Sequence, residues 1–161
     1  SDRFMKRAKL FHIIIASGFG SGFSPFAPGT AGALVAVIIW TVLFYVIPFN
    51  ILLVVTSLLI VLFTAAGIWS ADKLESEWGK DPSKVVVDEM VGVWIALLAV
   101  PVGNVWYILF AFLLFRFFDI FKPLGIRKME QLEGGIGVMA DDILAGIYSF
   151  LLLMGVRWLI G

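Results

Sequence analysis

The sequence predicts an all-α, polytopic membrane helical bundle of about five spans, with an N-terminal interfacial helix and a Gly/Pro-rich loop. Of its 161 residues, 61% are hydrophobic and 15% charged, and the mean hydropathy is +1.02. These values lie outside the usual range of soluble domains. Residues 1–161 are expected to form a single membrane-embedded domain.

Charge and cysteine content exclude several functions. The 12 basic residues balance the 12 acidic ones, so no basic surface for nucleic acid is expected. The chain contains no cysteine, which removes thiol catalysis, disulfides and thiolate metal sites.

The first thirty residues predict a surface helix followed by a loop. Phe4, Ala8, Phe11 and Ile15 recur at helical spacing among basic residues, which is typical of a helix that lies in the membrane interface over residues 1–16. Glycine and proline are frequent in residues 17–30 and predict a loop. Its last residue, Thr30, is expected to cap the next helix.

Five apolar runs predict the spans: residues 31–47, 51–70, 90–100, 105 to about 121, and 143–160. The first is just long enough, at ~1.5 Å per residue, to approach the ~30 Å hydrocarbon thickness. The third is short, so either it crosses where the bilayer thins or its acidic start is drawn below the interface. Residues 72–84 and 124–140 are polar and are expected to face solvent.

The distribution of charge predicts the orientation. Every Lys and Arg except Arg157 falls in the N-terminal segment, in residues 72–84 or in residues 116–128. Five spans place these three segments on one side, which the positive-inside rule makes cytoplasmic. All the acidic residues fall on the same side, although acidic residues contribute little to orientation and therefore need another explanation.

Five carboxylates gather at the predicted ends of the third, fourth and fifth spans: Asp88, Glu89, Asp119, Asp141 and Asp142. A compact bundle would bring these ends together, and oxygen-rich clusters suit hard cations such as Mg²⁺. Because neighbours on a helix point about 100° apart, we expect one member of each adjacent pair to face the centre and the other to cap its helix. Which member is the ligand stays open.

Basic residues accompany these carboxylates and indicate an anionic ligand. Arg116, Lys122 and Arg127 all lie within nine residues of Asp119 along the chain. Arginine suits bidentate contact with phosphate, and lysine suits a point-charge contact. Glycines in residues 18–22 and 134–137 could add backbone N–H donors. The alternatives are that each acidic pair only favours its helix dipole, and that Arg116 and Asp119 form a structural ion pair.

Four blocks of the sequence resemble the phosphatidylglycerophosphatase A family. They appear in the family's order and cover most of the chain. Their matching residues are Gly18 to Gly22, Ser24, Pro25, Pro28, Gly29, Thr30 and Gly32; Val87, Asp88, Glu89, Val91, Gly92, Trp94 and Ile95; Phe115, Arg116, Asp119, Lys122, Pro123, Ile126 and Arg127; and Gly134, Gly135, Gly137, Met139, Asp141, Asp142, Ala145 and Gly146.

The resemblance implies a Mg²⁺-dependent bacterial phosphatase that converts phosphatidylglycerophosphate to phosphatidylglycerol and inorganic phosphate. It would be a multi-pass protein of the inner membrane, with its site at the cytoplasmic face and a lipid as its substrate. The five carboxylates would supply the ligands of one or two Mg²⁺ ions and, with Lys122, the catalytic residues. Lys122, Arg127 and Arg116 would bind phosphate.

Several alternatives stay open at this point. The nucleophile is either water or one of the aspartates. A CDP-alcohol phosphotransferase would also use Mg²⁺-binding aspartates, but its Asp-x-x-x-Asp spacing is absent here. A non-enzymatic ion carrier or structural bundle predicts charges near the membrane midplane, whereas these charges crowd one end. The oligomeric state is left open.

Overall fold

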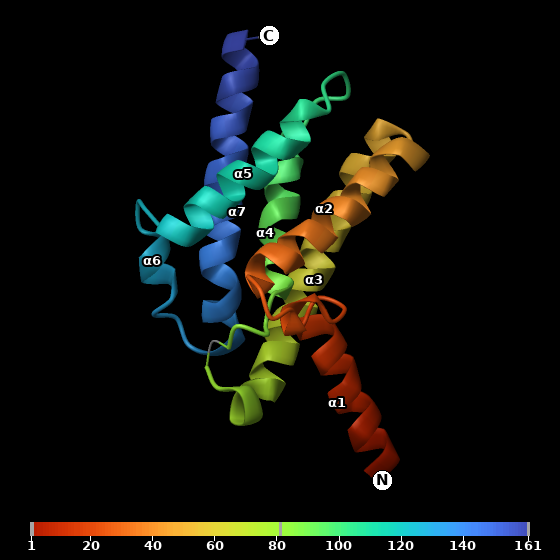
Figure 1. The fold of residues 1–161 in the computed structure, drawn as a ribbon, viewed down its shortest axis with the longest axis vertical. Helices are drawn as coiled ribbons and strands as arrows, with labels where there is room; N and C mark the ends of the chain where they lie inside the picture. The colour runs from red at the N-terminus through yellow and green to blue at the C-terminus, as the bar shows by residue number, and fades with distance from the viewer. Residues whose placement is uncertain (1, 81, 161) are drawn as a thin grey trace.

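The computed structural model describes residues 2–80 and 82–160, and all regular structure in these residues is helical (Figure 1). This confirms the all-α prediction for the described part of the chain. The elements are α1 (Asp2–Ala16), the 3₁₀ helix η1 (Ser21–Phe23), α2 (Pro28–Val46), α3 (Phe49–Trp78), α4 (Val87–Leu97), α5 (Trp106–Phe121), α6 (Ile126–Met129) and α7 (Gly134–Ile160).

Three helices are long and apolar enough to cross a membrane: α2 with 19 residues, α3 with 30 and α7 with 27. They correspond to the first, second and fifth predicted spans. Helices α4 and α5 occupy the third and fourth predicted spans but have only 11 and 16 residues. Membrane crossing by α4 and α5 therefore stays a prediction.

Helix α4 lies at the centre of the bundle, with α2, α3, α5 and α7 packed around it (Figure 1). Almost all of its side chains are buried. Trp94 anchors α4 to α2, because its indole N–H donates to the carbonyl of Ala36 over 3.0 Å. At the far end, the Arg157 guanidinium donates to the carbonyl of Ala99 over 3.0 Å and ties the end of α7 to the residues just after α4.

Two glycines let α4 and α7 approach backbone to backbone. A Cβ atom on Gly146 would collide with the carbonyl oxygen of Gly92, and one on Gly92 would lie 2.7 Å from the carbonyl oxygen of Asp142. Small residues at a helix crossing allow this close approach. The contact brings the acidic start of α4 and the acidic stretch of α7 together.

The start of α7 differs from the prediction. The last span was expected over residues 143–160, after a polar connection, but α7 begins at Gly134. The N–H of Gly135 donates to the Asp72 carboxylate over 2.6 Å, and a Cβ on Gly135 would collide with the backbone of Ile68. Gly134 and Gly135, which suggested a loop, therefore lie against α3, and Gly137 packs on the backbone of Leu132 just before α7. Asp141 and Asp142 lie about two turns inside α7 instead of capping it.

Two other boundaries also differ. Helix α2 begins at Pro28, with Ala27 as the N-cap instead of Thr30, because proline has a helical φ angle and lacks the N–H that the first turn leaves unbonded. Helix α3 continues through the charged residues after Ser70 and ends at Trp78, where Gly79 has a φ of 88°. Lysine and glutamate favour helices, so charge alone does not end one.

Helix α1 packs against the second half of α3. The Lys9 ammonium lies 2.8 Å from a carboxylate oxygen of Glu77. His12 is buried in this interface, where its Nδ1 lies 2.9 Å from the Ser70 hydroxyl and its ring stacks edge-on against Trp69 at 4.7 Å. These contacts make His12 a packing residue between α1 and α3.

Candidate active site

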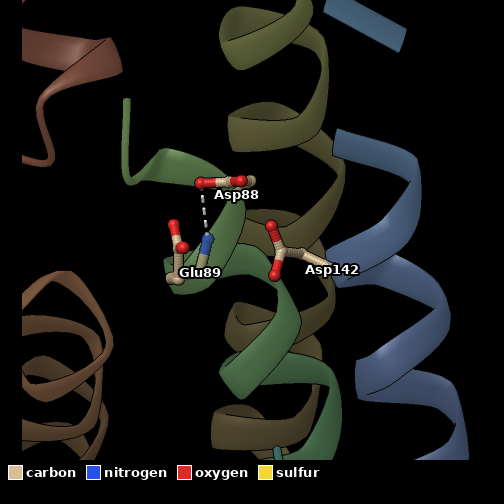
Figure 2. A group of neighbouring side chains, drawn as sticks. All are labelled: Asp88, Glu89 and Asp142. Carbon is tan, nitrogen blue, oxygen red and sulfur yellow. Dashed lines mark hydrogen bonds between the residues drawn. The ribbon is translucent and has the colours of Figure 1, made fainter. Parts of the chain in front are cut away.

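The five predicted carboxylates meet in two overlapping groups. Asp88 and Glu89 in the first turn of α4 face Asp142 of α7 (Figure 2). The second group joins Asp119, near the end of α5, to Asp141 and Asp142. Within each group, one oxygen of every residue lies within 4.8 Å of the others. Asp142 belongs to both groups, so it links three helices.

Both members of each adjacent pair belong to these groups, whereas one of each pair was expected to face the centre and the other to cap its helix. The Asp88 carboxylate accepts a hydrogen bond from the N–H of Glu89 over 3.0 Å (Figure 2). Asp141 accepts in the same way from the N–H of Asp142, also over 3.0 Å. Each first aspartate thus folds forward over the backbone of the next residue, and the oxygens of both residues lie within the groups described above.

Arg116 and Lys122 bind these carboxylates from α5 and the residue after it. The Arg116 guanidinium lies 2.5 Å from an oxygen of Asp119, one turn later on the same helix. Lys122 lies 2.6 Å from Asp141 and 3.5 Å from Asp119. Its backbone has a φ of 49°, in the left-handed region, and this ends α5 and turns the side chain toward α7. Lys122 therefore connects α5 to α7 electrostatically.

The surroundings of Lys122 keep it positively charged. Burial alone lowers the pKa of the ammonium, but the hydrogen bond and charge of Asp141, with the charges of Asp119 and Asp142, outweigh it. The pKa of Lys122 consequently lies above its ordinary value. A fixed ammonium of this kind can neutralise an anionic ligand at neutral pH.

Two predicted or neighbouring residues have unexpected positions. Arg127 is exposed and donates to the Phe121 carbonyl over 3.3 Å, at the end of α5, so the structure does not pair it with the carboxylates. Glu130 was not predicted as a site residue, yet its carboxylate lies 3.5 Å from the Lys122 ammonium. No short motif marks Glu130, because its partner is brought near by the turn around α6.

The start of α2 and the loop before it lie close to the site. A Cβ on Gly29, in the first turn of α2, would lie 2.9 Å from a carboxylate oxygen of Glu89 and 3.5 Å from the Arg116 guanidinium. Gly22 packs on the backbone of Lys84, just before α4. The glycines of this loop thus hold α2 and the entry to α4 together, with Gly29 closest to the charged groups.

Some buried polar atoms of the site have no hydrogen-bond partner among the described residues. They are Glu89 Oε2, Asp142 Oδ1 and Arg116 Nε. Five carboxylates also face only two cations, Arg116 and Lys122, in the cluster itself. Buried polar atoms are normally paired, and an excess of one charge attracts its opposite. The site can therefore accept a cation at its carboxylates and an anion at its basic groups.

A buried acidic cluster with fixed cations, held inside a bundle of apolar helices, defines a polytopic membrane protein equipped for phosphate chemistry. The family model described as phosphatidylglycerophosphatase A matches residues 14–157. The chain belongs to the phosphatidylglycerophosphatase A family, and it is an enzyme of the phosphoric monoester hydrolase class.

Three relatives are similar to most of the chain, and two of them carry the name of this family. A Bacteroides thetaiotaomicron protein with the provisional name phosphatidylinositol-3-phosphatase is 64% identical over 98% of this chain and 100% of its own length. Phosphatidylglycerophosphatase A of Haemophilus influenzae is 41% identical over 90% of this chain and 88% of its own. The Escherichia coli enzyme of that name is 34% identical over 98% and 90%. No solved structure matches the chain.

Proposed function

We propose that this protein is a Mg²⁺-dependent phosphatase that hydrolyses the phosphate monoester of phosphatidylglycerophosphate to phosphatidylglycerol and inorganic phosphate. The observation that carries the proposal is the meeting of five carboxylates with Arg116 and Lys122 inside a membrane bundle. The names of the Haemophilus and Escherichia relatives support the choice of substrate. The phosphate of such a lipid would meet the charged cluster while its acyl chains stayed in apolar surroundings.

The donor set suits Mg²⁺. All five side chains offer hard oxygen ligands, and Glu89 Oε2 and Asp142 Oδ1 are buried without a hydrogen-bond partner among the described residues. Asp88, Glu89 and Asp142 would hold one ion, and Asp119, Asp141 and Asp142 would hold a second. When bound, Mg²⁺ lowers the pKa of a bound water and neutralises charge on phosphate.

The basic residues would bind and orient the phosphate. Lys122 stays protonated and can donate to a phosphoryl oxygen while it remains beside Asp141. Arg116 has a buried Nε–H without a partner among the described residues, and this group could donate to a second oxygen. Arg127 would contribute if its guanidinium left the Phe121 carbonyl. Such contacts strengthen as negative charge shifts in the transition state.

The reaction breaks the bond between phosphorus and the headgroup oxygen and forms a bond from phosphorus to the attacking oxygen. The leaving oxygen takes up a proton, which releases the lipid alcohol. The attacking oxygen belongs either to water or to one of the aspartates, which would give an acyl-phosphate. The two routes differ in whether an acyl-phosphate forms on the protein: in the aspartate route hydroxylamine should trap it as an aspartyl hydroxamate, whereas direct attack by water on phosphorus leaves no such adduct.

We further propose that the protein lies in a bacterial inner membrane with the site at the cytoplasmic face. Every basic residue except Arg157 lies in α1, in the second half of α3 and the loop after it, or between Arg116 and Lys128. The positive-inside rule favours a cytoplasmic location for these segments. The three bacterial relatives support the choice of organism class.

The test is phosphate release by the purified protein in detergent. Phosphatidylglycerophosphate is compared with phosphatidylinositol 3-phosphate, because the 64% identical relative carries a name that refers to the latter. EDTA should abolish release and Mg²⁺ should restore it. Absence of metal-dependent release from phosphatidylglycerophosphate contradicts the proposal, and faster release from the inositol lipid would favour that substrate instead.

Substitution of Lys122 tests the site itself. Lys122→Met keeps most of the side-chain volume but removes the ammonium, so kcat should fall by about 10²–10³, as for other lost transition-state donors. Lys128→Met removes an exposed lysine from the same connection and should leave kcat unchanged. Equal rates for the two variants would remove Lys122 from the site.

A further inference from the structure

An apolar groove of about 450 Å³ runs along the bundle between α2 and α5. Its α2 wall consists of Leu34, Val37, Thr41 and Tyr45. These residues are three or four positions apart, so they form one continuous face of the helix. The opposite wall is apolar too and includes Leu109 and Phe112 of α5.

One end of the groove lies near the charged cluster. Arg116 follows Phe112 by four residues and therefore lies one turn further along the same face of α5. On α2, Leu34 follows Gly29 by five residues, and Gly29 lies against Glu89 and Arg116. The helical rise puts the start of the groove ~6–8 Å along these helices from the cluster.

The length of the groove matches one leaflet of a bilayer. From Leu34 to Tyr45, α2 rises ~16 Å, which is about half of the ~30 Å hydrocarbon thickness. The groove also opens to the outside of the bundle, since 44% of Leu34 and 44% of Leu109 remain exposed. A molecule in the bilayer could therefore enter it sideways between the two helices.

We propose that this groove binds one acyl chain of the phospholipid substrate and positions the phosphate at the carboxylate cluster. The proposal rests on the proposed function, because the substrate must be a lipid. A phosphate at the Arg116 end would meet the Nε–H of this guanidinium, which has no partner among the described residues, and the acyl chain would extend along Val37 toward Tyr45. The apolar walls and the cation at one end match the two parts of an anionic lipid.

A larger apolar groove between α1 and the end of α3 is a weaker candidate. It holds about 830 Å³ and is lined by residues such as Phe11, Trp69 and Lys73. Its lining residues belong to α1 and α3, and neither helix carries a carboxylate of the cluster or a cation bound to it, whereas α5 carries both Arg116 and Asp119. A chain in that groove would therefore not be continuous with the site.

The test blocks the groove in the full-length protein. Val37→Trp would fill it, whereas Val42→Trp makes the same change on a part of α2 that does not line the groove and is 56% exposed. Rates are compared for phosphatidylglycerophosphate with long acyl chains and with six-carbon chains. Val37→Trp should lower kcat/KM at least about tenfold for the long chains and less than about twofold for the short ones, while Val42→Trp changes neither.

Other outcomes overturn the inference. If Val37→Trp lowers kcat/KM equally for long and short acyl chains, the substitution damages the site or the fold. If Val37→Trp and Val42→Trp have equal effects on kcat/KM, the groove has no role in substrate binding. If the unmodified protein releases no phosphate from either lipid, the proposed function fails. Crosslinking then tests separately whether the groove binds an acyl chain. A phosphatidylglycerol with a photoactivatable acyl chain should then label α2 and α5, and Val37→Trp should reduce this labelling; labelling unaffected by the substitution refutes the groove.

Discussion

The contact between Gly146 and Gly92 gives the sharpest prediction, because it fixes the distance between the two helices that carry most of the carboxylates. In Gly146→Ala, the new Cβ would lie 3.1 Å from both Cα and the carbonyl carbon of Gly92, and closer still to its oxygen. Carbon atoms in contact lie ~3.5–4.0 Å apart. The helices must therefore separate by at least ~0.4–0.9 Å.

This displacement should harm activity more than folding. Overpacking of this size costs about 1–3 kcal/mol of stability. Asp142 lies about one turn before Gly146, and Asp88 one turn before Gly92, so the same displacement separates their carboxylates. Because a 1 Å misplacement can cost about 10²-fold in rate, we expect kcat/KM to fall by about 10- to 100-fold.

The assay is phosphate release in detergent together with thermal unfolding. Gly155→Ala is the matched control, since a Cβ on Gly155 of the same helix meets no described atom within 4 Å outside its own stretch of backbone. It should keep full activity and gain up to about 1 kcal/mol of stability from the better helix propensity of alanine. Full activity in Gly146→Ala, or an equal loss in Gly155→Ala, would refute the reasoning.

Three further predictions concern stability. In EDTA, Asp142→Asn should raise the free energy of unfolding by about 1–3 kcal/mol, because it removes a buried charge among like charges; a lower melting temperature than the unmodified protein would contradict this. Asp72→Ala should cost about 0.5–1 kcal/mol by uncapping α7, whereas Glu75→Ala on the same helix should be neutral by thermal unfolding. Burial, and then the charge of Lys73, lower the pKa of His12 below its ordinary value of 6.5. As pH falls below about 6.5, the state with α1 undocked binds more protons at His12 than the folded state does, so docking of α1 on α3 should weaken. A nitroxide label on α1 should then become more mobile, and His12→Gln should abolish this pH dependence.

The helices could be predicted from the sequence wherever hydrophobicity alone determined them. The fourth span was expected from residue 105 to about 121, and α5 runs from Trp106 to Phe121. The meeting of the five carboxylates was also predictable, because ionised residues in so apolar a chain need partners. The structure confirms this meeting, whereas metal binding and the roles of the individual residues stay predictions.

The predictions from sequence were wrong where the role of a residue depended on a contact with a residue far away in the chain. Gly135 has the local signature of a loop, but its missing side chain makes room for the backbone of Ile68 on α3. Asp72 likewise caps a helix more than sixty residues later in the chain. Such contacts leave no periodic pattern, since glycine marks both flexible turns and close helix packing.

The close packing of α4 explains how the bundle can hold together five carboxylates that repel one another. Like charges in a poorly solvated site repel, and the simplest relaxation would be for α4 and α7 to move apart. The close packing at Gly92 and Gly146, with the hydrogen bond from Arg157 to Ala99, holds α4 and α7 together. Glycine is a poor helix former, so Gly92 and Gly146 reduce the stability of their helices. The close helix contact that they allow holds the carboxylates at a short distance. A chain built in this way should lose its activity before it loses its fold.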